Sequence, residues 1–406
     1  MVRKHLAGFG LALLLGACAS TPTPQPAKPS TPTIARPEAP PPLLREVRFS
    51  DLPNWERADH SPALTALRRQ CANWVNFTPD RPLGGAYGGT VGMWLPACAA
   101  AQSVAPGGER AFFESYFTPA SINIAGGEAR LTAYYEPVIT ASRTLAPGLT
   151  EPLLLKPTDM VTVDLAGFAL AYDDSTLRGA PRALTGQLQG NKVVPYPKRE
   201  AIIPYQGQII GYANPADVYN LQVQGSGRLG FLDGQQVRAA YAAQNGYKWR
   251  SALIALRDTG QVSGATWANM RSYFDANPGA AKSVLNYDPS YIFFAEEPIT
   301  DTSAGPRGAA NVPLTPMGSM AVDPAYHPYG ALIYVDGVYD GAAFDRLVVA
   351  QDTGGAIKRG PLRGDFFAGT GPEAGRWAER MNSPTKMWTL IPKGAPIAML
   401  DGAARG

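Results

Sequence analysis

Apolar residues recur every three or four positions in several parts of the chain, which is the spacing of helices with one buried face. One such stretch opens at Ser61 with proline next, a common helix start, and its apolar positions are Leu64, Leu67, Cys71 and Val75. The other predicted helices contain Phe112 and Phe113 or cover residues 235–244, 251–257, 265–277 and 372–381.

Short runs of β-branched and aromatic residues, bounded by glycine and proline, lie between these helices and predict strands. They fall at residues 131–137, 193–194, 202–203, 209–210, 222–224, 291–294, 332–335, 346–350 and 387–391. A chain of 406 residues can hold two domains, or one with a large insertion. The pattern predicts a mainly β (α+β) protein, and we interpret residues 138–228 as a β-rich unit inserted between residues 47–137 and 229–406.

The first 17 residues have the pattern of an export signal. Arg3 and Lys4 precede an apolar run over residues 6–15, which is shorter than the roughly 20 residues that span a bilayer. The segment ends in Leu-Gly-Ala-Cys and resembles a bacterial lipobox, so Cys18 is the expected lipidation site. An ordinary signal cut at another position is the alternative.

Residues 18–46 read as a tether, because nine prolines lie between Thr21 and Pro42 among small polar residues. Ala19 and Ser20 follow the cysteine in place of an aspartate, which in bacterial lipoproteins points to the outer membrane. We therefore expect an outer-membrane lipoprotein that faces the periplasm of a Gram-negative bacterium, where the large insoluble substrate is the cell wall.

Charge and composition narrow the chemistry. The net charge of +3 falls to +1 once Arg3 and Lys4 leave with the signal, so no nucleic-acid partner is expected. The chain has three histidines and no G-x-S-x-G motif, which disfavours metal clusters and serine-histidine catalysis. We expect carboxylate chemistry, with no metal and no organic cofactor.

Cys71 and Cys98 are the cysteines that remain after Cys18. In an oxidising compartment such a pair is a disulfide candidate. Two separately buried thiols are the alternative.

Asp352 is the candidate catalytic acid. It follows the apolar run of residues 346–350 and precedes Gly354 and Gly355, so its carboxylate is expected at the end of a buried strand, next to backbone that a ligand can approach. The other interpretation is that Asp352 only caps a turn. A second carboxylate, Asp365, follows in the same stretch.

Two further segments are candidates for sugar binding. Tyr134 and Tyr135 are neighbours in a predicted strand, so one should pack inward while the other faces a ligand, unless both pack. Gln224, Gly225 and Ser226 offer amide and backbone groups, with Gln224 expected on a strand. A lone Gly-Ser-Gly is weak evidence for phosphate binding.

Four segments together resemble the membrane-bound lytic murein transglycosylase A family. The C-terminal part, about residues 290–395, resembles its 3D domain, named for three aspartates that match Asp323, Asp352 and Asp365. The four segments are LTAYYEP from 131, LQVQGSG from 221, LTPMGSMAVDP from 314 and AQDTGGAIK from 350.

The resemblance implies a double-psi β-barrel with a second, smaller β-barrel inserted and a glycan groove between them. It also implies a lyase that cleaves the β-1,4 bond between N-acetylmuramic acid and N-acetylglucosamine and leaves 1,6-anhydromuramic ends, with Asp352 as acid and then base. Peptidoglycan strands are the implied partner, with other cell-wall enzymes as further candidates. The implied substrate-binding residues are Thr132, Tyr134, Tyr135, Gln224, Gly225, Ser226, Asp323 and Asp365.

One position departs from the family pattern. Arg359 stands between Lys358 and Gly360, where the family has glycine directly, so the loop from Asp352 to Asp365 is one residue longer than expected. Two other functions stay open: a muramidase-type hydrolase that uses an aspartate pair, and a non-catalytic wall-binding lipoprotein.

Overall fold

The computed structural model describes residues 43–85, 87–123, 128–173, 175–178, 183–357 and 360–395. The expected signal, Cys18, most of the expected tether and Arg359 lie outside these ranges. The last four residues assigned to the tether are an exception. Leu43–Glu46 forms strand β1, which pairs with β2 (Phe117–Asn123), and Leu44 is buried. Cross-strand hydrogen bonds and this buried side chain place the segment in the folded body.

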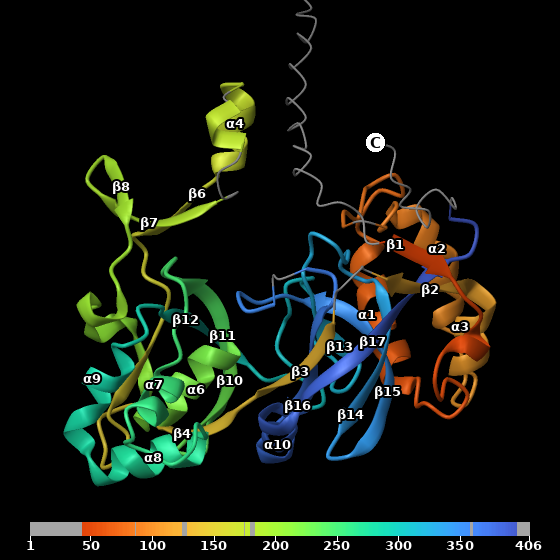
Figure 1. Cartoon of the computed structure of the whole chain (residues 1–406). Helices are drawn as coiled ribbons and strands as arrows, with labels where there is room; N and C mark the ends of the chain where they lie inside the picture. Colours follow the sequence, from red (N-terminus) through yellow and green to blue (C-terminus); the bar gives the residue numbers. More distant parts are fainter. Residues whose placement is uncertain are drawn as a thin grey trace, which may run out of the picture. The chain divides into compact units, whose positions relative to one another are not determined.

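Most strands of the C-terminal part form one barrel (Figure 1). The described sheet runs in the order β1-β2-β17-β14-β15-β13-β16-β3, and β3 also pairs with β17. The strands from β17 to β3 therefore close a ring. Besides β1 and β2, their bounds are Ala129–Glu136 (β3), Ser319–Ala321 (β13), Leu332–Tyr339 (β14), Ala342–Asp352 (β15), Arg363–Thr370 (β16) and Asn382–Pro392 (β17).

A second sheet forms the other barrel, in the described order β12-β11-β10-β4-β9-β5. Leu155, just after β5, bridges to Phe294 in β12, so this sheet nearly closes. The predicted mainly β fold with two barrels is confirmed. The strands are Val138–Ser142 (β4), Glu151–Leu154 (β5), Ile209–Ala213 (β9), Gly227–Phe231 (β10), Gln236–Gln244 (β11) and Ile292–Pro298 (β12), and β6 (Met160–Val163), β7 (Leu184–Gln189) and β8 (Lys192–Pro195) form a separate small sheet.

The second sheet changes the proposed domain boundary. A cut after residue 228 would divide β10, the pairing partner of β4, and would separate β4, β9 and β5 from β11 and β12 of the same sheet. We therefore propose that the inserted unit continues to Pro298, where β12 ends.

Two predicted elements were of the wrong type, and residues 202–203, predicted as a short strand, lie in none of the described strands. Residues 236–244 of a predicted helix form strand β11, because Val237 and Ala239 are buried between β10 and β12 despite the alanine-rich sequence. Residues 222–224 belong to helix α6 (Pro215–Gln224) instead of a strand. The Asn214 side chain accepts a hydrogen bond from the first turn of this helix, and Gly225 ends it with a φ of 91°.

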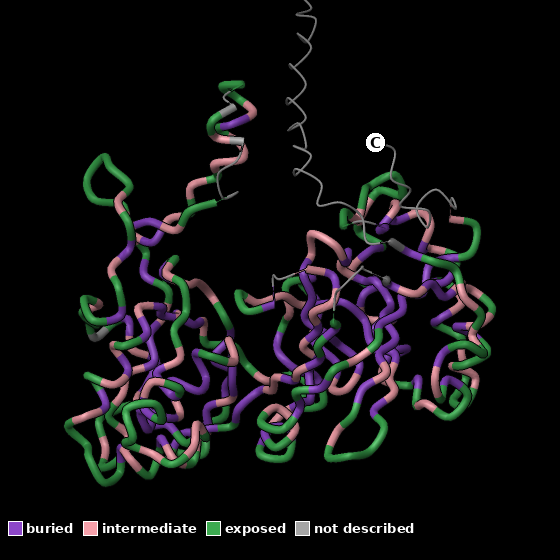
Figure 2. Tube along the Cα trace, viewed as in Figure 1, coloured by how far each residue is buried: buried purple, intermediate pink, exposed green. Residues whose placement is uncertain are grey.

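Helices cover the barrel on one side, and others lie on one side of the second sheet (Figure 1). The barrel interior is packed with residues such as Leu131, Val348 and Phe366, and a second core lies between the barrel and helices α1 to α3. Figure 2 shows the buried backbone concentrated in these layers. The other helices are Ser61–Trp74 (α1), Val91–Ala101 (α2), Glu109–Tyr116 (α3), Leu165–Ala171 (α4), Ser175–Arg178 (α5), Ala252–Asp258 (α7), Trp267–Ala276 (α8), Ala281–Leu285 (α9) and Pro372–Arg380 (α10).

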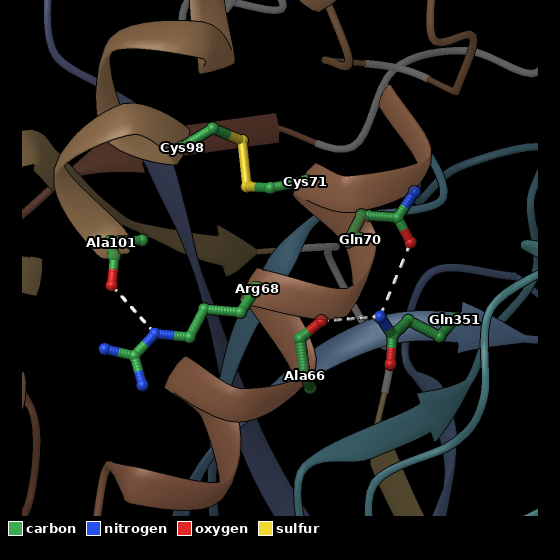
Figure 3. Close-up of a disulfide and its surroundings, with 7 residues drawn as sticks. All are labelled: Ala66, Arg68, Gln70, Cys71, Cys98, Ala101 and Gln351. Atoms are coloured by element: carbon green, nitrogen blue, oxygen red, sulfur yellow. Dashed lines mark hydrogen bonds between the residues drawn. A yellow bond between two sulfur atoms is a disulfide. The ribbon is translucent and has the colours of Figure 1, made fainter. Parts of the chain in front are cut away.

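Cys71 of α1 and Cys98 of α2 form a disulfide, with 5.4 Å between their Cα atoms (Figure 3). The side chain of Arg68 adds a hydrogen bond from α1 to the carbonyl oxygen of Ala101 at the end of α2. The pair of helices that supports the barrel is therefore held together both covalently and by a polar contact.

Removing the disulfide should destabilise the protein. The bridge spans 27 positions, for which the chain-entropy model gives a loss of about 3.5 kcal/mol in the free energy of unfolding. We expect a double variant with Cys71→Ala and Cys98→Ala to lose about this much free energy of unfolding. Its midpoint of urea unfolding should therefore lie at a lower urea concentration than that of the wild type. Wild-type protein unfolded in reducing agent should match the variant, and an unchanged midpoint would contradict the prediction.

Candidate active site

Asp352 is held at the end of β15 by its neighbour in sequence. Gln351 is fully buried, and its amide nitrogen donates to the carbonyl oxygen of Ala66 in α1 at 2.9 Å (Figure 3). Its amide oxygen accepts a hydrogen bond from Ser319 of β13 at 2.6 Å. Because successive strand residues point to opposite faces, anchoring Gln351 toward α1 fixes the direction of the Asp352 side chain.

The Asp352 carboxylate accepts three hydrogen bonds. The hydroxyl of Tyr134 in β3 donates to Oδ2 at 2.7 Å. Oδ1 accepts from the backbone N–H of Thr353 at 2.9 Å and of Ala309 at 3.0 Å. A side chain on Gly308 would meet the carbonyl oxygen of Gln351 at 2.5 Å, so glycine lets this loop approach the carboxylate.

The surroundings of Asp352 raise the pKa of its carboxyl group. Burial raises the pKa of Asp352 above its ordinary value, although the hydrogen bonds from Tyr134, Ala309 and Thr353 oppose the shift. Burial also raises the pKa of the Tyr134 hydroxyl well above its usual range, and the neighbouring Asp352 adds to this. The tyrosine therefore stays a neutral donor, and the aspartate can hold a proton at a higher pH than a solvated one.

Asp365 lies two strands away. Ala321 of β13 stands opposite Asp352 on one side and opposite Asp365 of β16 on the other. Thr132 of β3 is the next partner of Asp365 and donates its hydroxyl to Oδ1 at 2.5 Å. Arg363 in turn donates to the Thr132 hydroxyl oxygen at 2.7 Å. Thr132 therefore lies on the same strand as Tyr134, and its partner Asp365 lies on β16, two strands from Asp352 in the same barrel.

The burial of Asp365 should make folding stability depend on pH. Burial, and to a smaller extent the charge of Asp352, raise its pKa from 3.8 to about 6. A raised carboxyl pKa contributes stability that is complete below pH 3.8 and is lost as the pH rises to about 6. We expect the free energy of unfolding of Asp365→Asn, relative to wild type, to increase between these values in urea titrations. A difference that stayed flat over this range would contradict the prediction.

Asp323 holds the loop after β15. It is buried, and its carboxylate accepts hydrogen bonds from the backbone N–H groups of Ala325 at 3.0 Å and Gly360 at 3.1 Å. The buried His327 from the same turn contacts the carbonyl oxygen of Pro361 at 2.7 Å. Burial lowers the pKa of His327 to about 4, so the ring is neutral at physiological pH. These contacts give Asp323 a loop-positioning role, and its contact with a substrate stays a prediction.

The remaining predicted binding residues gather around the C-terminal end of α6. The Gln224 side chain accepts the backbone N–H of Tyr135 at 3.1 Å, Gly225 ends the helix, and Ser226 is buried. Tyr135 does not face Asp352, since its hydroxyl accepts a hydrogen bond from Asn220 at 2.7 Å. The structure therefore brings Tyr134 and Thr132 to the carboxylates, and leaves Tyr135 on the other face of β3.

Sequence reasoning missed the backbone donor at Ala309. It lies on a loop 43 positions before Asp352, and a backbone N–H carries no residue-type signal. The one available indication was glycine-rich residues 305–308, Gly-Pro-Arg-Gly, because glycine marks places where backbone approaches another group closely.

Comparison with known proteins identifies the family. A model of the MltA-specific insert domain matches residues 130–295, and a model of the 3D domain matches residues 318–391. A membrane-bound lytic murein transglycosylase from Agrobacterium tumefaciens is 30% identical, with a TM-score of 0.73 over 88% of this chain and 99% of that one. The chain belongs to the membrane-bound lytic murein transglycosylase A family.

Other members of the lytic murein transglycosylase A family show the same relationship. MltA from Neisseria gonorrhoeae is 28% identical, with a TM-score of 0.73 over 91% of this chain and 97% of that one. Membrane-bound lytic murein transglycosylase A of Vibrio cholerae is 32% identical over 203 residues, which are 47% of this chain and 54% of that protein. The chain therefore spans about half the length of the curated relatives it matches.

The relatives are named as membrane-bound. In this chain, none of the helices that the structure describes has the length and hydropathy that a bilayer-spanning segment requires.

Proposed function

We propose that this protein is a peptidoglycan lytic transglycosylase, with Asp352 as its single acid and base. The observation that carries the proposal is the environment of Asp352. Its carboxyl group is fixed at a strand end, accepts a hydrogen bond from Tyr134 and has a raised pKa. The chain also belongs to the lytic murein transglycosylase A family. Catalytic acids need a pKa raised toward the working pH, and burial is one way to raise it.

The hydrogen bonds suggest which oxygen carries the proton. Oδ1 of Asp352 already accepts two backbone N–H groups, so a proton there would meet two donors. Within the described ranges Oδ2 has a single partner, the hydroxyl of Tyr134, which can rotate to accept instead of donate. Asp352 would therefore donate its proton from Oδ2 to the leaving glycosidic oxygen.

Ring closure would complete the reaction. As the bond between the anomeric carbon of N-acetylmuramic acid and the oxygen of N-acetylglucosamine breaks, the 6-hydroxyl of the same muramic acid attacks the anomeric carbon. The proton of that hydroxyl passes to the Asp352 carboxylate, which restores the acid. No water is consumed, and the nucleophile gains from being already attached to the substrate. A second carboxylate is therefore not required as nucleophile or base, in contrast to hydrolytic glycosidases.

The remaining roles follow from position. Thr132, Tyr134 and Asp365 stand beside Asp352 on the barrel and would contact the glycan near the scissile bond. A second group of residues would act further from Asp352, by fixing how α6 packs against β3: Gln224, Gly225, Ser226 and Tyr135. Asp323 would keep the loop after β15 in place.

Attachment to the outer membrane is part of the proposal. A lipid on Cys18 and a proline-rich tether would hold the folded body in the periplasm, within reach of peptidoglycan strands. The names of the relatives as membrane-bound enzymes support this placement.

The products decide between the proposed reaction and its rivals. Purified sacculi digested by the protein should release fragments that end in 1,6-anhydromuramic acid, which mass spectrometry finds lighter by one water than a reducing end. Reducing ends would indicate a hydrolase that uses Asp352 with a second carboxylate. Binding to sacculi with no soluble product would indicate a non-catalytic wall-binding protein.

A further inference from the structure

A cavity lies on the face of β3 away from Asp352. Neighbouring residues of a strand point to opposite faces: Tyr134 reaches Asp352, whereas Tyr135 lines this cavity. Its volume is about 240 Å³, and its walls come from the β3–β4 connection, α6, α8 and the start of α10. We call it the Tyr135 cavity; Figure 1 labels the helices α6, α8 and α10 that contribute residues to its lining.

An unsatisfied polar atom lies in the wall of the Tyr135 cavity. Asn220 of α6 is 7% exposed, and its Nδ2 donates to the Tyr135 hydroxyl at 2.7 Å. Its Oδ1 is buried and has no hydrogen-bond partner among the residues that the structure describes. Turning the amide over would leave the nitrogen without a partner instead. A buried polar atom without a partner is destabilising, so a ligand that supplies a hydrogen bond here would recover that free energy.

The other walls combine an aromatic ring, an ion pair and apolar side chains. Trp267 of α8 is half-buried and lines the cavity, and Val138 lines it while 53% exposed. Asp217 and Arg271 also line it and bond to each other at 2.5 Å. Because these two charges neutralise each other, the cavity offers donors and acceptors without excess charge.

We propose that the Tyr135 cavity binds one N-acetylhexosamine unit of a glycan strand, at a site separate from Asp352. The sugar ring would lie against Trp267, as pyranose rings do on aromatic faces. The acetamido N–H would donate to Asn220 Oδ1, and the acetyl methyl would cover apolar surface at Val138. The hydroxyl groups would bond to the Asp217–Arg271 pair.

This choice of ligand rests on the proposed function, because a glycan is then the polymer at hand. The peptide chains of the cell wall are a less suitable ligand. Their charged termini would have to compete with the ion pair that Asp217 and Arg271 already form with each other. The volume suits a single sugar unit, with space for roughly eight water molecules at liquid density. The site would hold the strand while a different part of it enters the Asp352 site.

The test blocks the mouth of the Tyr135 cavity without removing any contact. Ala268 is exposed on α8 and lines the cavity, and Ala276 is exposed at the end of the same helix and does not line it. Ala268→Arg and the matched control Ala276→Arg are made in the full chain that also carries Asp352→Asn, so that sacculi are bound but not digested. Retention on sacculi is measured by sedimentation, and binding of methyl N-acetyl-β-glucosaminide by saturation-transfer NMR.

Ala268→Arg should weaken retention on sacculi about tenfold, equivalent to 1.4 kcal/mol. It should also reduce the saturation-transfer signal of methyl N-acetyl-β-glucosaminide, whereas Ala276→Arg should leave that signal unchanged. Trp267→Leu, which keeps an apolar side chain without the aromatic face, should have a similar effect and covers the case in which Ala268→Arg does not fold. Equal retention by the Ala268 and Ala276 variants would overturn the proposal. So would binding of alanyl-alanine in place of the sugar. If active protein releases no product from sacculi while these differences persist, the proposed function fails and this site stands.

Discussion

Replacing Asp352 with asparagine is expected to lower the release of soluble fragments from sacculi by about 10³-fold, within the range that general acid–base groups contribute. Asparagine keeps the shape of the side chain and one acceptor oxygen for the N–H groups of Thr353 and Ala309, so the fold should be retained. It cannot donate an acidic proton to the leaving oxygen. Turnover is measured from soluble muropeptides, with thermal unfolding as the check on folding.

The matched control is Asp258→Asn at the end of α7, where the Asp258 side chain is 59% exposed and pairs with the neighbouring Arg257 on the surface. This variant should digest sacculi at the wild-type rate. If Asp352→Asn also kept turnover close to wild type, the assignment of Asp352 would be wrong. If it lost both turnover and cooperative unfolding, Tyr134→Phe would test the same site, since it removes one hydrogen bond to the carboxylate and leaves the acid in place.

The sequence was informative wherever function follows local structure. The apolar run before Asp352 predicted a buried strand, and the strand β15 ends at that residue. The alternation in β3 predicted that Tyr134 and Tyr135 face different surroundings, which the structure bears out. Which of the two meets the acid could not be read, because the contact joins residues 218 positions apart.

The errors also have physical causes. Residues 236–244 contain several alanines, which favour helix locally, but pairing with β10 and β12 outweighs a preference of a few tenths of a kcal/mol per residue. In α6 the signals were present, with Asn214-Pro215 at the start and Gly225 at the end. The spacing of Gln222 and Gln224 fits the two-residue period of a strand, although a helix of ten residues also fits this sequence.

The two barrels are joined by a buried charge cluster that no local pattern indicates. Glu136 ends β3, immediately before the chain enters the second sheet, and it is fully buried. It accepts hydrogen bonds from Arg228 of β10 at 2.8 Å, Arg238 of β11 at 2.6 Å and Thr370 of β16 at 2.7 Å. Both arginines also donate to the carbonyl oxygen of Ala304, on the return to the barrel. One carboxylate thus holds the outgoing and returning connections together.

Glu136→Gln is therefore expected to lower the free energy of unfolding by about 3–5 kcal/mol, the cost of removing one partner from a buried ion pair. The amide keeps the size of the side chain but leaves the charges of Arg228 and Arg238 without a counter-ion in the protein interior. Glu296→Gln is the matched control, because Glu296 pairs with Arg143 where both side chains are about one-third exposed. Such surface pairs contribute at most about 1 kcal/mol.

Urea unfolding of the two glutamine variants separates burial from pairing as the source of the effect. Both changes remove one carboxylate from an arginine contact, so equal losses would mean that the Glu136 cluster is as solvated as the surface pair and does not lock the joint. A large loss confined to Glu136→Gln would mean that the stability of this joint depends on a buried charge balance, which lies two residues along β3 from the Tyr134 that bonds to Asp352.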